Sequence, residues 1–453
     1  MSDRWWSRRT LLRAAILGAT SAASGCSRYA SRPPPLPPRL ASTGHPAADA
    51  ILASTARPLI PARDLSLPGA PGNRAGDCTR MLQDAIDDAH AQGGGRVVVP
   101  AGELSVGALR LRSRVELHLA PGATLRFRSD PEQYPLVNTR YEGLECVNRS
   151  PMIYAVGETD IAITGGGSLD AAATAAWNRG GDRAAVLEPL VARGVPVADR
   201  IVAGKLRTSM IETVGCRRVL VQGVTLSGSP FWQIHPTLCS DVTIAGVTTT
   251  DSGHANSDGC NPESCERVVI QDCTLAAGDD VIGLKSGRDE DGRRIATPCR
   301  NIVVFGCQAE GPFAFIACGS EQSGGIENVY ACANRTFGRG VKYALWVKSN
   351  SRRGGYTRNV NLIGLRGRVR GAVLAATMSY ADQSGSFPPV FEGIHLRDLA
   401  VEGPAVLNVE GLPASRIRDL TVSSSLFSGV ASADRVRDAD VARRDLIVNG
   451  VRF

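Results

Sequence analysis

Short segments in which apolar and polar residues alternate recur through most of the chain. The clearest four begin at Cys216, Cys239, Cys265 and Cys299. Each has a β-branched residue three and five positions after the cysteine, and Gly or Asp at the seventh. Such alternation predicts a short strand with one buried face, and Gly or Asp predicts the turn that follows. Successive copies begin 23, 26 and 34 residues apart, a spacing typical of a solenoid.

Weaker copies of the same unit extend the pattern towards both ends of the chain. They lie at residues 161–163, 360–362, 394–396, 417–420 and 446–448. Since each strand would stack on the strand one turn earlier, the sequence predicts an all-β fold, a single-stranded right-handed parallel β-helix. Equivalent side chains then form columns. The four leading cysteines are expected to form one such column inside the core.

A helical pattern precedes the first strongly apolar strand. Between residues 77 and 90 the apolar residues have helical spacing, at Met81, Leu82, Ala85, Ile86 and Ala89. Three glycines at 93–95 end this pattern before an apolar strand at 96–100. We expect the helix to cap the open N-terminal end of the β-helix core.

The first 62 residues indicate export rather than a folded domain. Arg8 and Arg9 precede a short apolar stretch, which predicts a twin-arginine signal over residues 1–26. This segment ends in a lipoprotein-like box, so Cys26 is a candidate for lipidation. Residues 27–62 are proline-rich and predict a disordered linker, followed by the β-helix domain at 63–453. The expected location is the periplasm, free or anchored to the membrane by lipid; the alternative is ordinary cleavage near Ala23 and secretion.

Composition narrows the function classes. The 453 residues are 43% apolar and 21% charged, as in a soluble globular protein. The formal net charge of +7 comes without a Lys/Arg run, so nucleic acid is not an expected partner. Because twin-arginine substrates fold in the reducing cytoplasm, the 12 cysteines are expected to be buried thiols rather than disulfides. We predict no metal site, and we expect the acidic run 289–291 to be a solvated surface turn.

Two polar, glycine-flanked segments interrupt the repeat and carry the candidate chemistry. They are Asn256–Gly259 and Gly278–Asp280, and they bring in Asp258, Asp279 and Asp280. Carboxylates on adjacent turns repel one another and raise one another's pKa, so a fold seldom keeps such a cluster without a use. Glycosidic cleavage needs one protonated carboxyl and one ionised carboxylate. The alternative is that each aspartate is an ordinary turn residue.

The order of four motifs resembles glycoside hydrolase family 28, the polygalacturonase-like enzymes of bacterial pectin degradation, whose fold is a pectin-lyase-like solenoid. The motifs are Ser229–Pro236, Asn256–Gly259, Gly278–Gly292 and Gly319–Gly325. The resemblance implies an inverting hydrolase of pectic polysaccharide with no cofactor. It implies Asp279 as the general acid, and Asp258 and Asp280 as the pair that holds and deprotonates the attacking water. We expect the enzyme to be a monomer.

The resemblance also implies residues that bind the substrate, and here the chain departs from the family. Asn256, Lys285 and Lys348 fall on expected binding positions. Phe313 stands where the family has a histidine, and Trp346 stands where it has a carboxylate-binding arginine. Because an indole suits a sugar ring better than a carboxylate, we hypothesise a neutral, esterified or rhamnose-bearing sugar beside the cut. Alternatively, both aromatic side chains belong to the core.

Two rival functions remain open on the sequence alone. A β-helix polysaccharide lyase would use a basic residue and calcium, and would release unsaturated products. A non-catalytic carbohydrate-binding solenoid would explain the missing histidine and arginine. The three retained aspartates favour the hydrolase, because a decayed site has no reason to keep a costly carboxylate cluster.

Overall fold

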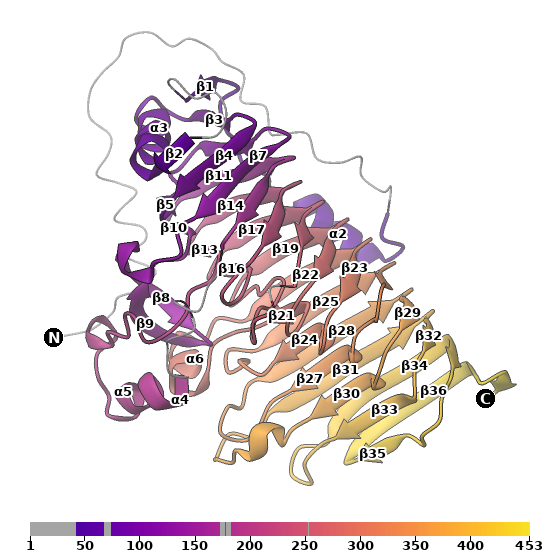
Figure 1. Ribbon diagram of the computed structural model, residues 1–453. Coiled ribbons are helices and arrows are strands. Elements are labelled where there is room, and N and C mark those ends of the chain that lie inside the picture. The colour runs from indigo at the N-terminus through magenta and orange to yellow at the C-terminus, as the bar shows by residue number, and fades with distance from the viewer. Residues whose placement is uncertain (1–41, 68–73, 173–176, 178–182, 252) are drawn as a thin grey trace.

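The computed structural model of the protein describes residues 42–67, 74–172, 177, 183–251 and 253–453. The predicted signal segment, Cys26 and the first part of the predicted linker lie outside the described residues. Within them, the chain winds into a right-handed parallel β-helix with three columns of strands, so the predicted fold class is confirmed (Figure 1). No helix in these ranges is long and apolar enough to cross a membrane.

The first column is the longest and runs the length of the coil. Its strands are β1 (Asp64–Ser66), β3 (Gly95–Val99), β6 (Val115–Leu119), β11 (Thr159–Gly165), β14 (Arg217–Gln222), β17 (Ser240–Ala245), β19 (Glu266–Gln271), β22 (Cys299–Phe305), β25 (Ile326–Cys332), β28 (Tyr356–Ile363), β31 (Val390–Arg397), β34 (Ile417–Ser428) and β36 (Ala439–Val448). All the weaker repeat copies fall on strands of this column.

The second column consists of short strands. They are β2 (Arg74–Asp77), β4 (Gly102–Val106), β7 (Ala123–Phe127), β12 (Ser168–Asp170), β15 (Thr225–Ser227), β18 (Thr248–Thr249), β20 (Thr274–Ala276), β23 (Gln308–Glu310), β26 (Arg335–Thr336), β29 (Arg366–Arg368) and β32 (Ala400–Glu402). Strand β37 (Val451–Arg452) pairs antiparallel with β36 and ends the coil.

The third column carries the face on which the candidate site lies. Its strands are β5 (Leu109–Arg110), β10 (Ile153–Val156), β13 (Ile211–Val214), β16 (Ile234–Thr237), β21 (Ile282–Leu284), β24 (Ala314–Gly319), β27 (Tyr343–Lys348), β30 (Ala372–Thr377), β33 (Ala405–Glu410) and β35 (Arg435–Arg437). Single bridges through Cys260 and Glu263 join β16 to β21, so the column is continuous.

The register explains why the repeat could be found in the sequence. Val219 pairs with Val242, Val242 with Val268, and Val268 with Ile302, so equivalent positions stack one above another. The four leading cysteines form the expected internal column and are fully or almost fully buried. All eleven cysteines in the described residues are buried free thiols, which confirms the prediction for that part of the chain.

The predicted N-terminal helix is present as α3 (Thr79–Ala91). Its buried residues Leu82, Ile86 and Ala89 belong to the main core, and the helix contacts β3, β5 and β6. It therefore covers the end of the coil, as expected from its apolar spacing.

The predicted disordered linker is wrong for residues 42–62. Helix α2 (Pro46–Ser54) lies against the outside of the first column. It packs Ala48 and Ile51 on Val303 and Phe305 of β22 and on Tyr330 of β25. Only Ala48 and Ile51 of this helix are buried, but together they cover an apolar patch that the coil would otherwise leave open to solvent.

After α2 the chain runs along the outside of the coil back to β1. The backbone N–H groups of Ala56 and Leu59 donate to Asp241 and Asp160, at 3.2 and 2.8 Å. Ile60 is buried against two apolar residues of β11 and β14. We call residues 45–63 the strap; it joins turns of the coil that are far apart in sequence.

Two insertions lie beside the third column. One is the hairpin of β8 (Leu136–Tyr141) and β9 (Leu144–Arg149), preceded by the 3₁₀ turn η1 (Pro131–Gln133). The other holds α4 (Arg183–Val186), α5 (Glu188–Ala192) and η3 (Val197–Asp199). Together with α6 (Asp289–Ile295) they form a cap beside β21 (Figure 1).

The acidic run 289–291 is not the solvated surface turn that we expected. It forms the first turn of α6, where carboxylates are favoured by the helix dipole. Asp291 is buried and lies 2.6 Å from Nη1 of Arg200 in the cap. Asp289 pairs with Arg352 and Arg353 at 3.1 and 3.3 Å. These ion pairs tie the cap to the coil.

Candidate active site

The structure brings together the three predicted aspartates. Asp258 lies in the loop between β18 and β19, and Asp279 and Asp280 lie in the turn between β20 and β21. One carboxylate oxygen of each lies within 4.8 Å of those of the others. Gly278 permits this approach, because a Cβ atom there would lie 2.3 Å from Oγ of Ser257. A single water could therefore contact two of the carboxyl groups.

Asp280 is the aspartate of the cluster with the closest counter-ion. It is buried, with 1% of its surface exposed, yet both of its oxygens have donors. Nζ of Lys348 donates to Oδ2 at 2.7 Å, and the backbone N–H of Ala314 donates to Oδ1 at 3.1 Å. A buried carboxylate with a counter-ion and a backbone donor is stabilised in its charged form.

Asp258 has a different environment. Nδ2 of Asn261 donates to its Oδ2 at 2.8 Å, and Nζ of Lys285 stays 3.8 Å away. Its Oδ1 accepts no hydrogen bond from any residue that the structure describes. Burial, followed by the charge of Asp279, raises the pKa of Asp258 to about 8. This carboxyl therefore holds a proton at neutral pH.

Asp279 is the most accessible of the three. It is half-buried, and its Oδ1 accepts the backbone N–H of Asp280 at 2.8 Å. Burial and the neighbouring charge of Asp280 raise its pKa above the usual range of an aspartate. A carboxyl that stays protonated to higher pH and reaches the pocket is suited to donate a proton to a leaving group.

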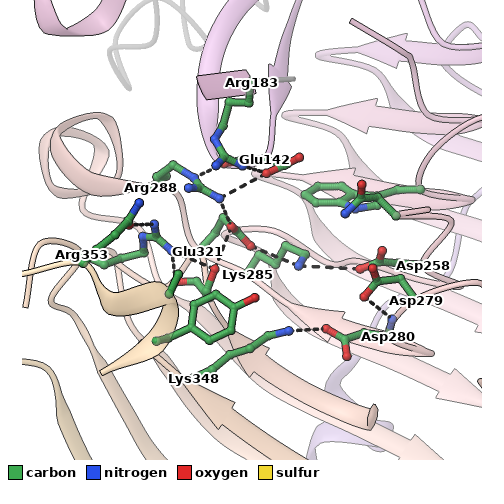
Figure 2. A pocket seen from close by; sticks show the side chains of 16 residues that line it. Glu142, Arg183, Asp258, Asp279, Asp280, Lys285, Arg288, Glu321, Lys348 and Arg353 are labelled. Atoms are coloured by element: carbon green, nitrogen blue, oxygen red, sulfur yellow. Dashed lines mark hydrogen bonds and ion pairs between the residues drawn. The ribbon is translucent and has the colours of Figure 1, made fainter. Parts of the chain in front are cut away.

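The aspartates form one side of a pocket of about 310 Å³ (Figure 2). This volume suits one or two sugar rings. The pocket is lined by Glu142, Arg183, Trp232, Asn256, Asp258, Asp279, Asp280, Lys285, Arg288, Ser320, Glu321, Lys348, Arg353, Tyr380, Ala381 and Gln383.

Opposite the aspartates, the pocket wall is rich in arginine. Arg288 reaches both Glu142 of the hairpin β8–β9 and Glu321, which follows β24. Arg183 of α4 pairs with the same Glu142, and Arg353 donates to Oγ of Ser320 at 2.8 Å. Figure 2 shows these arginines on the side away from the carboxyl cluster.

Glu321 links this wall to the catalytic cluster. Burial alone would raise its pKa, but Lys285, Arg288 and Arg353 hold the pKa of Glu321 well below its usual range. Nζ of Lys285 donates to Glu321 at 3.2 Å, closer than its 3.8 Å approach to Asp258. Glu321 thus competes with Asp258 for the same ammonium group.

The predicted binding residues divide into two groups. Asn256, Lys285 and Lys348 line the pocket, as the resemblance implies. Phe313 and Trp346, which were also predicted to bind substrate, do not. They are not core residues either, because both are half-buried outside the coil, with ring centroids 6.1 Å apart. The ammonium group of Lys348 lies 3.8 Å from the centre of the Trp346 ring, between that ring and the cluster.

The arginine-rich wall of the pocket was not predicted from the sequence. Arg288 and Glu321 lie inside motifs that carry the family resemblance, so a signal for them existed. Glu142 and Arg183 lie in the two insertions, which break the repeat and leave no periodic signal.

Carboxylate clusters of this kind can also hold a metal ion. Here Lys285 and Lys348 place two ammonium groups 3.8 and 2.7 Å from the cluster. These positive charges would repel a divalent cation and supply the neutralisation that it would provide. The arrangement is that of a carbohydrate-active hydrolase: carboxyls in different charge states, next to a water-sized gap, in a pocket the size of a sugar.

Comparisons with known proteins identify the particular family. Residues 197–403 match the model of glycosyl hydrolases family 28. The exopolygalacturonase of Thermotoga maritima has 35% sequence identity and a TM-score of 0.86, over 90% of this chain and 96% of that one. A probable polygalacturonase of Vitis vinifera is 27% identical over 79% of this chain and 72% of its own length. The exo-poly-alpha-D-galacturonosidase of Dickeya chrysanthemi is 24% identical over 80% of this chain and 66% of its own.

This chain belongs to glycosyl hydrolases family 28. It is therefore a glycoside hydrolase, and the lyase and the non-catalytic solenoid considered from the sequence give way to that assignment.

Proposed function

We propose that this hydrolase cleaves galacturonate-containing pectic polysaccharide by general acid and base catalysis. Membership of the family and the polygalacturonase names of its relatives support this substrate class. The observation that carries the mechanism is the difference in charge state among three neighbouring aspartates. Asp280 has Lys348 as a counter-ion at 2.7 Å, whereas Asp258 and Asp279 have raised pKa values.

In this proposal Asp279 is the general acid, because it is the accessible member of the cluster and its pKa is raised. Its proton goes to the glycosidic oxygen as the bond to the anomeric carbon breaks. Asp280, with Asp258, holds the attacking water, and the carboxylate of Asp280 takes the water's proton as the new carbon–oxygen bond forms. Asp258 assists by orienting that water rather than as the main base, because it retains its own proton.

We propose inversion at the anomeric carbon. The cluster's oxygens lie within 4.8 Å of one another, less than the roughly 6.5–9.5 Å between carboxyl groups in most inverting enzymes. In favour of inversion, both oxygens of Asp280 already have donors, which leaves the carboxylate suited to hold water rather than to attack carbon. The initial anomer of the product, observed by NMR, decides between the two outcomes, and retention would overturn the proposal.

We further propose that the enzyme acts at chain ends. The cap formed by the hairpin and by α4, α5 and α6 lies beside β21, and Glu142 and Arg183 from its two insertions line the pocket. Because the cap closes one end of the pocket, a polymer chain that binds there cannot continue past that end. Arg288 and Arg353 line the pocket, and each guanidinium has several N–H donors, so it can bind a terminal uronate while it keeps its present carboxylate partner. An exo-acting relative supports the same mode.

The sugar next to the cut is proposed to be neutral, esterified or rhamnose-bearing. Trp346 replaces the family's arginine, and Lys348 is engaged with Asp280, so little free positive charge faces a uronate there. Strong turnover of plain polygalacturonate, equal to that of esterified or rhamnose-containing pectin, would contradict this.

Export by the twin-arginine route, lipidation of Cys26 and a monomeric state also remain proposals from the sequence. Labelling of exported protein with a fatty acid analogue tests the lipid. Wild type should take up the label, and Cys26→Ser should not.

The experiment that tests the function is a product assay on a panel of pectic polymers. Wild type should release reducing sugar from at least one polymer, mainly as monomers or dimers, without unsaturated products and without loss on adding EDTA. Asp279→Asn should reduce release by about 10³-fold or more. Asp398→Asn is the matched control, because Asp398 is an exposed turn residue. Equal activity of wild type and Asp279→Asn would overturn the assignment of the acid.

A further inference from the structure

The same order of three side chains occurs twice around the carboxyl cluster. In each case a lysine lies between an aspartate and the face of a tryptophan ring. Nζ of Lys348 is 2.7 Å from Asp280 and 3.8 Å from the centre of the Trp346 ring. Nζ of Lys285 is 3.8 Å from Asp258 and 4.7 Å from the centre of the Trp232 ring. The shorter distances of the first unit mark it as the more tightly held.

The ring of Trp346 is itself fixed by other aromatic side chains. Tyr343 lies 5.1 Å away in a tilted arrangement, Tyr380 lies 5.8 Å away edge-on, and Phe313 is stacked at 6.1 Å. In the third column the neighbours of Trp346 are Ala317 and Ala375, whose small side chains leave room for an indole. The ring therefore has one fixed orientation, with a face towards Lys348.

Lys348 depends on this contact because it is almost fully buried. The titratable groups facing its ammonium are Asp279, Asp280, Tyr380 and Lys285, and the centre of the Tyr380 ring lies 5.4 Å from it, farther than that of Trp346. Asp280 attracts it, whereas Lys285 repels it. An aromatic face attracts a desolvated cation at about this distance and replaces some of the lost hydration. An arginine at position 346 would instead place a second positive charge beside Lys348.

We propose that Trp346 is a positioning residue for hydrolysis: its ring holds the Lys348 ammonium against Asp280, and so keeps the base ionised and in place. This inference rests on the proposed function, since it gives Asp280 the role of base. Trp346 thus acts through Lys348 and does not touch the sugar. The indole that stands in place of the family's arginine therefore also serves the catalytic carboxylate.

Steady-state kinetics across pH test this role against a sugar-stacking role. Trp346→Leu should lower kcat about tenfold, with KM changed less than about twofold, and should move the acid limb of the pH profile up by about half a unit. The shift is expected because Lys348, without the ring beside it, is held less firmly as the counter-ion of Asp280. Trp346→Phe retains an aromatic face and should recover most of the loss.

Phe387→Leu is the matched control. Phe387 has Arg293 3.8 Å from its ring centre, the same separation as in the Trp346 pair, and it does not line the pocket. The Phe387→Leu variant should have the kcat and the pH profile of wild type. A rise in KM for Trp346→Leu with an unchanged pH profile would show sugar stacking and overturn the proposal, as would kinetics identical to wild type.

A double-mutant cycle keeps the inference testable even if no pectic polymer is cleaved. Denaturant unfolding is measured for wild type, Trp346→Leu, Lys348→Met and the double variant. Coupled side chains should give non-additive losses, with the double variant less destabilised than the two single losses combined. Additive losses would overturn the proposal, whereas absence of hydrolysis by wild type on every polymer would overturn the proposed function alone.

Discussion

Two lysines face the same carboxyl cluster, but they pair with its aspartates differently. Lys348 donates to Asp280 at 2.7 Å and forms no second ion pair with an acidic side chain among the described residues. Lys285 is shared, because it donates to Glu321 at 3.2 Å and approaches Asp258 only to 3.8 Å. One aspartate therefore stays ionised, while the other has a pKa of about 8.

The comparison teaches how neighbouring carboxyls of one residue type acquire different roles. Three aspartates in a small volume cannot all ionise, because like charges repel and burial penalises each of them. The distance of each lysine decides which carboxyl gives up its proton. Glu321 is part of this decision, because it draws Lys285 away from Asp258.

Replacing each lysine in turn tests whether the two have different roles, and these variants should show the largest effects on kcat and stability. Lys348→Met leaves Asp280 buried without its counter-ion, so kcat should fall about 10³-fold and the free energy of unfolding by about 3 kcal/mol. Lys285→Met should lower kcat only about tenfold, because Glu321 keeps Arg288 and Asp258 is protonated. Enzyme kinetics and denaturant unfolding measure both.

Lys342→Met is the control for the two lysine variants. Lys342 is exposed and lies over Phe313 and Tyr343 rather than in the pocket. Its kcat and stability should match those of wild type. Equal losses for Lys348→Met and Lys285→Met would show that the two lysines are interchangeable.

Asp258→Asn should stabilise the protein while impairing hydrolysis. The pKa of Asp258 is raised in the folded state, so its contribution to stability is fully present below about pH 4 and is lost as pH rises through about 8. An amide does not titrate. The gain in the free energy of unfolding should therefore be near zero at pH 4 and reach about 5 kcal/mol at pH 8, at about 1.4 kcal/mol for each unit by which the pKa is raised. Thermal unfolding across this range would contradict the prediction if the gain were the same at both ends.

Glu321→Gln should leave each lysine paired with one aspartate, and of the predicted effects on hydrolysis its effect should be the smallest. Without the carboxylate of Glu321, Lys285 is free to turn to Asp258 and lowers its pKa. Because Asp258 orients the attacking water in its protonated form, the alkaline limb of the pH profile should then move down by about half a unit. Glu402→Gln, which alters an exposed ion pair with Arg368, should leave the limb in place. An upward shift for Glu321→Gln would refute the idea of competition.

Most of the fold could be predicted because each turn of the coil has the same pattern of apolar and polar residues as the turn before it. The cysteine at 216 and its equivalents mark the register, since each strand meets the next at the same depth. Counting from these cysteines places Phe313 one turn after Asp279, because each lies 14 residues after its cysteine, and the backbone of the next residue, Ala314, does contact the cluster. Register alone could not show that Phe313 lies outside the pocket.

The insertions could not be predicted in the same way. Glu142 and Arg183 reach the pocket from segments with no repeat, so their partners depend on tertiary contacts alone. The acidic run 289–291 was misjudged for the same reason, because Arg200 and Arg353 come from distant parts of the chain. Helix α2 was missed because proline-rich sequence nearby suggested an extended linker for the whole segment.

The strap has a consequence for how the coil comes apart. A stack of turns in which each contacts only its neighbours can fray from either end, one turn at a time. The strap adds contacts between turns that are not neighbours, from Tyr330 on β25 back to Asp160 on β11. If one of the turns that the strap contacts loosens, the contacts between the strap and the other turns are lost as well. These turns, which include the one that carries Asp279 and Asp280, should therefore open together or not at all.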